Sequence, residues 1–313
     1  MVDPNNPFPV IGVEEHFLTD EVLQAWVNAG LFASDPSLAH NSGITGERLL
    51  DMAQGRLALM DEAGVDVQVL SLTTPALHEL GAASVEISMR CNDAIAEAIA
   101  RHPGRFQGLA TLPVFDPQAA ALELERCIKT LGFKGTMLSG RVGTRNLDHT
   151  DFAPIFECAS IMEAPVFLHP RTPPLAVRKA YYDGLNPEVD IALATYGLGW
   201  HYDAGLQFVR LMLSGIFDRL PGLQVILGHW GEMVLFYAER LSAMGGVAGL
   251  NRQISDYLKN NLYITSSGMF SPDYLQRASS IVGKEGLLFS TDFPYQYRHG
   301  HVARRFLNEC GLN

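Results

Sequence analysis

Short apolar runs, rich in β-branched and aromatic residues, alternate with longer amphipathic stretches along almost the whole chain. Eight runs have the length and composition of strands, and they cover residues 10–17, 65–72, 106–114, 134–140, 165–170, 224–229, 262–268 and 287–294. Their near-continuous apolar character is typical of parallel strands that are buried on both faces. The pattern therefore predicts a buried parallel sheet.

The stretches between these strands have helical spacing. In residues 203–220, Asp203 is placed to cap the start, and Leu206, Val209 and Leu213 repeat every three or four residues. Further helices are predicted at about 46–63, 84–102, 117–131, 151–162, 231–243, 271–282 and 300–311. Eight alternating strands and helices favour an α/β fold of the (β/α)8 TIM-barrel type. A doubly wound parallel sheet is the structural alternative.

No linker or shift in composition separates two halves, so residues 1–313 are interpreted as a single domain. Two connections are too long for ordinary turns: residues 18–45 follow the first strand, and residues 171–202 follow the fifth. Loops that follow barrel strands lie on the C-terminal face, where they form the walls of an active site. We expect both segments to line a cavity.

Four predicted strands end in side chains that can bind a metal ion: Glu14, Glu15 and His16 on the first, His169 on the fifth, His229 on the sixth and Asp292 on the eighth. The C-terminal ends of barrel strands meet at one mouth, so these residues are expected to form one cluster. A single histidine at a strand end is most often an ordinary polar residue. Burying so many ionisable groups together without partners would be very costly, which favours a metal site.

Strand alternation separates the two glutamates. Glu14 and His16 should point to one side of the strand, and Glu15 to the other. Together with His169 and Asp292, the first pair offers two imidazoles and two carboxylates, a set that suits one divalent ion, Zn or Mn. His229 would then support these ligands or take part in catalysis.

The net charge of −11 and the absence of a large lysine or arginine cluster give no footprint for nucleic acid or anionic lipid. No apolar run approaches the roughly 20 residues of a membrane span, and the first residues lack the regions of a signal peptide. Four scattered cysteines suit a reducing compartment. These features predict a soluble, cytoplasmic protein.

At these motifs the chain resembles the amidohydrolase superfamily, in particular the amidohydrolase-2 branch that contains the γ-resorcylate, 2,3-dihydroxybenzoate and 5-carboxyvanillate decarboxylases. The resemblance extends through "EEHF", "SLTTPA", "RCNDAIAE", "GLATLPVFDP", "FLHPR", "ILGHWGE", "YITSSG" and "LFSTDFPY". It implies a single Mn or Zn ion at Glu14, His16, His169 and Asp292. It also implies a substrate of the aromatic carboxylic acid class and a homo-oligomer, a dimer or tetramer.

The resemblance further implies a catalytic His229 with Glu232 as its partner, and an Arg240 that orients the substrate carboxylate. For a decarboxylase we expect Asp292 to deliver a proton to the ring carbon that loses CO2, while His229 and Glu232 set its protonation. Glu232 has a structural alternative, because an acidic residue also suits the start of a helix. Arg240 could equally be a surface residue of a helix.

A metal-dependent hydrolase of a lactone, ester or amide is the alternative function, with Asp292 as a base toward water. Glu14, in place of a first histidine, resembles the decarboxylases more than the lactonases. A barrel that binds a ligand without turnover is a third reading, and it predicts no stoichiometric metal. Further substrate contacts are predicted for Arg171, Phe293 and His201, although an outward salt bridge or loop packing would explain such residues as well.

Overall fold

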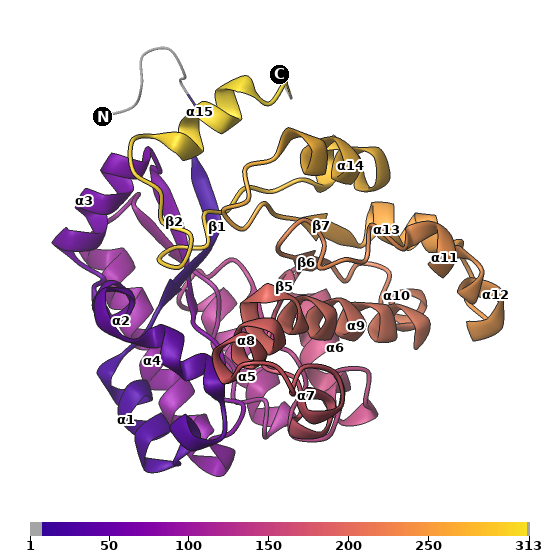
Figure 1. Ribbon diagram of the computed structural model, residues 1–313, viewed down its shortest axis with the longest axis horizontal. Coiled ribbons are helices and arrows are strands. Elements are labelled where there is room, and N and C mark those ends of the chain that lie inside the picture. Colours follow the sequence, from indigo (N-terminus) through magenta and orange to yellow (C-terminus); the bar gives the residue numbers. More distant parts are fainter. Residues whose placement is uncertain (1–7, 312–313) are drawn as a thin grey trace.

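The computed structural model describes residues 8–311, in which helices surround short parallel strands (Figure 1). The first sheet has the order β1-β2-β3 and the second the order β4-β5-β6-β7. All their pairings are parallel. The strands are β1 Ile11–Phe17, β2 Val67–Leu72, β3 Phe106–Gly108, β4 Thr136–Ser139, β5 Val166–His169, β6 Val225–Leu227 and β7 Leu262–Ile264. Seven predicted strands are thus observed, most of them shorter than expected.

The eighth predicted strand is an extended segment that connects the two sheets. Leu288 N donates to Ile264 O of β7 at 2.8 Å, and His16 N of β1 donates to Phe293 O at 2.7 Å. An isolated parallel bridge between Ala110 and Thr136 links the end of β3 to β4. Backbone contacts therefore join the two sheets to each other twice, between β3 and β4 and, through the segment after β7, between β7 and β1.

A small apolar cluster lies between the strands, separate from the main core. It takes one side chain from each strand segment, namely Val13, Val69, Leu109, Met137, Phe167, Ile226, Tyr263 and Leu288. The main core packs the outer faces of the strands against the helices, with Phe17, Leu168 and Phe208 among its fully buried members. Apolar side chains on both faces explain why the strand sequences are almost continuously apolar.

Most predicted helices are observed near their expected positions. Helices α4 Ser84–Arg101, α5 Pro117–Lys129, α6 Ala153–Ile161, α14 Pro272–Val282 and α15 Val302–Glu309 match single predictions. The prediction for residues 46–63 is met by two helices, α2 Gly43–Leu50 and α3 Gln54–Ala63. Helices α12 Met244–Ala248 and α13 Ile254–Asn260 were not predicted. No helix of the described residues is long and apolar enough to cross a membrane.

The helix predicted at residues 203–220 is wrong at its start and in its buried face. Helix α9 Gly199–Leu213 begins earlier, so Asp203 lies within it rather than at its cap, and α10 Ile216–Arg219 is separate. Asp203 is buried and pairs with Arg141 at 3.6 Å, whereas Leu206 is 53% exposed. The helix turns Phe208 and Leu211 inward instead, because tertiary packing selected a different face.

The two long connections fold into helical segments. The first contains α1 Asp20–Asn28 and the short 3-10 helices Leu31–Ala33 and Pro36–Asn41. The second contains α7 Leu175–Tyr181, α8 Pro187–Ala192 and the π-helical turn Leu193–Gly197, and it leads directly into α9.

Candidate active site

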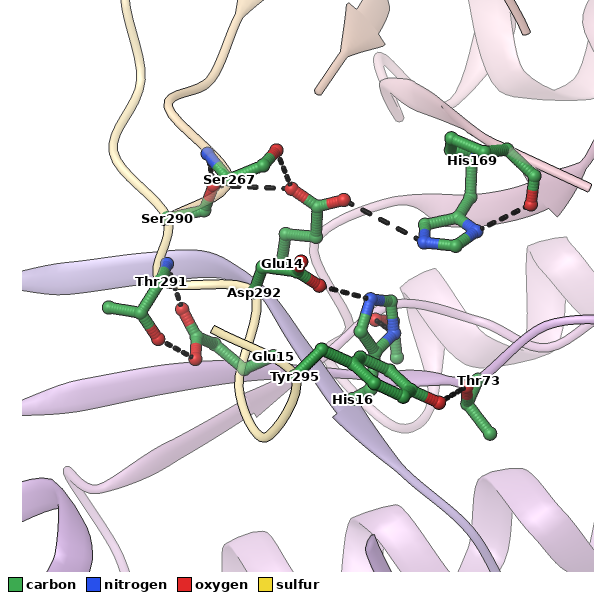
Figure 2. Close-up of polar contacts among 12 residues, drawn as sticks. Glu14, Glu15, His16, Thr73, His169, Ser267, Ser290, Thr291, Asp292 and Tyr295 are labelled. Atoms are coloured by element: carbon green, nitrogen blue, oxygen red, sulfur yellow. Dashed lines mark hydrogen bonds and ion pairs between the residues drawn. The ribbon is translucent and has the colours of Figure 1, made fainter. Parts of the chain in front are cut away.

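The ends of β1 and β5 bring three potential metal ligands together. One ligand atom each from Glu14, His16 and His169 can be chosen so that all lie within 4.8 Å of one another. All three residues are buried, and Glu14 and His16 are fully enclosed. Figure 2 shows Glu14 and His16 directed toward His169 and Asp292, while Glu15 turns to the opposite side. Alternation along the strand thus has the expected result.

Both histidines present a free nitrogen to this cluster. His169 Nδ1 donates to the carbonyl of Pro170 at 2.8 Å, which leaves Nε2 at 3.8 Å from Glu14 Oε1. His16 Nδ1 contacts Ser71 Oγ at 3.3 Å, and its Nε2 lies 3.4 Å from Asp292 Oδ1. Burial lowers the pKa of both rings, that of His16 to about 3, so both imidazoles are neutral. A neutral ring whose Nδ1 is held by a neighbour is the usual form of a metal-binding histidine.

Glu14 is held by one of its oxygens only. Its Oε2 accepts hydrogen bonds from Ser267, from Ser290 at 3.2 Å and from Thr265 at 3.3 Å. Its Oε1 and the Nε2 of His16 have no hydrogen-bond partner within the described part of the chain, although both atoms are buried. Buried polar atoms without partners are rare in folded proteins and point to a missing ligand.

The charges of the cluster also fit a divalent ion. Burial raises the pKa of Glu14 to about 7 and that of Asp292 to about 7. A cation between them would favour their ionised forms, and two carboxylates with two neutral imidazoles would balance its charge. The residues present therefore fit one divalent ion.

A second group adjoins the first and centres on Glu232. His229 Nδ1 lies 2.5 Å from Glu232 Oε1, and His201 Nδ1 lies 2.7 Å from Oε2. Burial raises the pKa of Glu232, but the two histidines outweigh burial and lower it to about 2. For His229, burial lowers the pKa, but Glu232, Glu14 and Asp292 outweigh it and raise the pKa to about 10. His229 Nε2 lies 3.9 Å from Asp292 Oδ2, so this ion pair faces the potential ligands.

The segment that carries His229 and Glu232 is not helical. The prediction of a helix over 231–243 is wrong in its first half, because α11 Ala238–Ser242 begins only after a series of turns. His229 and Glu232 both have φ of 49°, a left-handed conformation that is unfavourable for residues with side chains. Glu232 therefore does not stabilise a helix start. Asp292 also has positive φ, 56°, and such strain is typical of functional sites.

A cavity of about 370 Å³ opens onto both groups. His169, His201, His229 and Asp292 contribute to its lining. The remaining lining residues are His40, Thr45, Thr74, Tyr196, Trp200, Ser267, Met269, Tyr295 and Gln296. Both long connections contribute, as expected, through His40 and Tyr196. Sequence reasoning assigned nothing to His40, which has no motif context, and gave no role to Tyr295, although Tyr295 is the last residue of the motif "LFSTDFPY".

Three residues predicted to bind substrate lie outside this lining. Arg171 is buried but pairs with Glu79 and borders a neighbouring cavity. Phe293 faces the other side of its segment, where the guanidinium of Arg56 lies 4.6 Å from its ring. Arg240 is exposed on α11. Phe293 faces away from the cavity because successive side chains of an extended segment point to opposite sides, and its neighbour Asp292 points into the site. Of the four predicted contacts, His201 alone lines the cavity.

Comparison with known proteins places the chain in a family. The amidohydrolase family model matches residues 15–309. The chain belongs to the amidohydrolase family. It is 35% identical to the gamma-resorcylate decarboxylase of Polaromonas sp. strain JS666, over 95% of this chain and 91% of the relative.

Solved structures of amidohydrolase relatives have the same fold. The 5-carboxyvanillate decarboxylase of Sphingomonas paucimobilis is 29% identical, with a TM-score of 0.88 over 97% of this chain and 93% of the other. The dihydroxybenzoic acid decarboxylase of Polaromonas sp. JS666 is 32% identical, with a TM-score of 0.83 over 97% of this chain and 92% of the other. That structure contains manganese and the inhibitor 2-nitroresorcinol.

Proposed function

We propose that this chain is a metal-dependent carboxy-lyase that removes CO2, without oxidation, from a hydroxybenzoate such as 2,6-dihydroxybenzoate. The observation that carries the proposal is the cavity in which a potential metal cluster, with an unpaired Glu14 oxygen, faces the His229–Glu232 ion pair. The similarity of the chain to decarboxylases of this substrate class also supports a decarboxylase function. Aromatic side chains of Tyr196, Trp200 and Tyr295 suit the walls of a site for a benzene ring.

We propose that the fold that carries this site is a single (β/α)8 barrel domain. The bridge that links the end of β3 to β4, and the hydrogen bonds that link the segment after β7 to β1, support closure. The inner cluster, with one side chain from each of the eight segments, is the packing expected inside such a barrel. The ligands would then lie at the C-terminal ends of the strands.

In this proposal Glu14, His16, His169 and Asp292 hold one manganese or zinc ion. When bound, the ion would supply positive charge that stabilises the negative charge of the substrate's carboxylate and phenolate groups. The imidazoles are neutral because burial lowers their pKa, and the contacts of their Nδ1 atoms with Pro170 and Ser71 leave Nε2 to face the ion. A stoichiometric metal content in protein purified without chelator would separate this reading from a barrel that only binds ligand.

Asp292 and His229 carry out the proton transfer to the substrate ring. Asp292, ionised beside the ion, takes up the proton of His229 and transfers it to the ring carbon that bears the carboxylate, and the bond from that carbon to the carboxylate then breaks with release of CO2. The electron pair of the broken bond restores the aromatic ring, so no redox cofactor is needed. His229 Nε2, 3.9 Å from Asp292 Oδ2, is placed to donate this proton to Asp292. Glu232 keeps the imidazole ring oriented through its bond to Nδ1.

The proposal is tested with manganese-loaded protein and 2,6-, 2,3- and 2,4-dihydroxybenzoate and 5-carboxyvanillate. Turnover is followed by ultraviolet absorbance and by the CO2 released. We expect one CO2 per molecule of substrate consumed. Lack of activity with all four acids, together with hydrolysis of a lactone or ester, would replace this proposal with the hydrolase alternative.

We also propose that the chain forms a homo-oligomer. Exposed apolar side chains on and around α7 and α8 support this, including Leu175, Tyr181, Leu185 and Val189. Such a concentration is common at subunit interfaces. Light scattering coupled to size-exclusion chromatography should give twice or four times the 34.3 kDa chain mass, and a monomer would contradict the proposal.

A further inference from the structure

One face of α9 packs closely against Glu232. His201 and Gly205 are four residues apart, so they lie on the same side of the helix. His201 Nδ1 lies 2.7 Å from Glu232 Oε2, and a Cβ atom at Gly205 would lie only 2.3 Å from the backbone oxygen of Glu232. The glycine therefore permits the close approach that the histidine uses.

His201 completes the hydrogen bonding of a fully enclosed carboxylate. Glu232 Oε1 is bonded to His229 and Oε2 to His201, so both oxygens are engaged and the group is held against rotation. Without His201, a buried anionic oxygen would lose its charge-assisted bond. The carboxylate could then turn, and it would no longer hold the His229 ring in one orientation.

The other nitrogen of His201 connects this carboxylate to the cavity wall. His201 Nε2 lies 3.0 Å from the backbone oxygen of Tyr196, in the π-helical turn that follows α8. A carbonyl oxygen accepts only, and Glu232 is ionised because its pKa is lowered to about 2. His201 can satisfy both neighbours only when both of its ring nitrogens carry protons. The ring is therefore built into the site as a donor at both ends.

We propose that His201 is a positioning residue: through Glu232 it holds His229 toward Asp292, and it ties the Tyr196 turn of the cavity wall to that geometry. Its effect on turnover rests on the proposed decarboxylase function. Its effect on the hydrogen bonds does not, so the two can be tested separately.

The kinetic test compares H201A, H201N and L206A. The side-chain nitrogen of asparagine can take the place of Nδ1, whereas alanine leaves Glu232 Oε2 without a donor. Leu206 lies on the same helix but is exposed and outside the cavity lining, so L206A is the matched control. We expect H201A to lower kcat about 30-fold with KM within about twofold, and H201N to restore most of the loss. Metal content should not change in any variant.

A second variant disturbs the same contact without removing a polar group. In G205A the new methyl group would press on the Glu232 backbone, so α9 must move away. We expect a fall in kcat of about tenfold or more with KM little changed, while L206A remains at the wild-type level. A G205A enzyme with wild-type kcat would contradict a role for this close approach.

The structural test does not need activity. His229 Nδ1 lies 2.5 Å from Glu232 Oε1. In metal-free protein, the proton in this short hydrogen bond should give a far-downfield proton NMR signal. We expect this signal to be kept in H201N and L206A and to be lost or broadened in H201A. An unchanged signal in H201A would overturn the proposal, whatever the substrate assays show. If the signal responds as expected but no acid is decarboxylated, the positioning role stands and the proposed function fails.

Discussion

Two adjacent glutamates of β1, Glu14 and Glu15, are both fully buried but are used in opposite ways. Glu15 has partners for both oxygens: Thr291 N donates to Oε1 at 2.8 Å, while Thr291 Oγ1 at 2.5 Å and Gln68 Nε2 at 3.1 Å donate to Oε2. Even the neighbouring Gly12 leaves room for it, since a Cβ there would lie 2.0 Å from Glu15 Oε1. Glu14 Oε1 instead has no hydrogen bond to any residue between 8 and 311.

The difference shows how one strand can provide both a structural and a functional carboxylate. The side of Glu15 is closed by hydrogen bonds: Thr291 ties β1 to the segment after β7 (Figure 2), and Gln68 ties β1 to β2. The side of Glu14 has donors for one oxygen only, and its second oxygen faces His169. Leaving a buried acceptor unsatisfied costs stability, and a metal ion would recover that cost.

The largest expected effect is that of D292N. Asparagine keeps the size of the side chain but cannot deliver a proton, and it weakens the negative charge around the ion. We expect kcat to fall about 10⁴-fold. Steady-state assays at saturating metal measure this loss, and activity within tenfold of wild type would remove Asp292 from the catalytic step.

E14A should have the next largest effect. It should lower metal binding and leave the stability of the fold almost unchanged. We expect less than about a tenth of the wild-type metal content and a loss of activity of about 10³-fold. The unfolding free energy of the metal-free protein should change by less than about 1 kcal/mol, because the hydroxyls around Glu14 also bond one another. Elemental analysis and chemical denaturation check both parts.

E15A should have the opposite effect. Removal of this carboxylate leaves the Thr291 N–H and hydroxyl and Gln68 Nε2 without their buried acceptor, so we expect the unfolding free energy to fall by about 3 kcal/mol. The folded fraction should still bind one metal ion. Metal loss in E15A equal to that in E14A would mean that the two sides of β1 are not independent.

The last expected effect is a change in the pH dependence of stability. Burial raises the pKa of Glu15 from 4.5 to about 8, so the folded state binds more protons than the unfolded state between these values. The contribution to stability is full below pH 4.5 and is lost as the pH rises toward 8. In E15Q the decline should be shallower by up to about 1.4 kcal/mol per pH unit. Chemical denaturation at several pH values, with manganese present, measures the slope of the unfolding free energy. Manganese is included because the bound ion keeps Glu14 ionised, so that Glu14 does not add its own proton uptake. The same slope in E15Q and in the wild type would contradict the prediction.

Much of the candidate site could be predicted because strand periodicity is local. The separation of Glu14 and His16 from Glu15 required only a period of two residues. The convergence of His169, His229 and Asp292 required only that parallel strands end at the same edge. Neither inference depends on how any side chain packs.

The contacts that could not be predicted involve residues whose neighbours are distant in sequence. Arg171 pairs with Glu79 from the loop after β2, and the buried Asp203 pairs with Arg141 from the loop after β4. His40 reaches the cavity from the first long connection. No local pattern encodes such contacts, because both partners must first be brought together by the fold.

The sequence by itself determined the order of strands and helices, the family motifs and the set of groups that can bind a metal, because these depend on residue types and short-range spacing. Only the tertiary structure decided that Glu232 bridges two histidines, that Phe293 faces away from the cavity and that one oxygen of Glu14 has no hydrogen-bond partner among the described residues. Each of these depends on which atoms from separate segments lie within about 3 to 4 Å of one another, a range set by hydrogen-bond and packing distances. Spacing along the chain does not specify that.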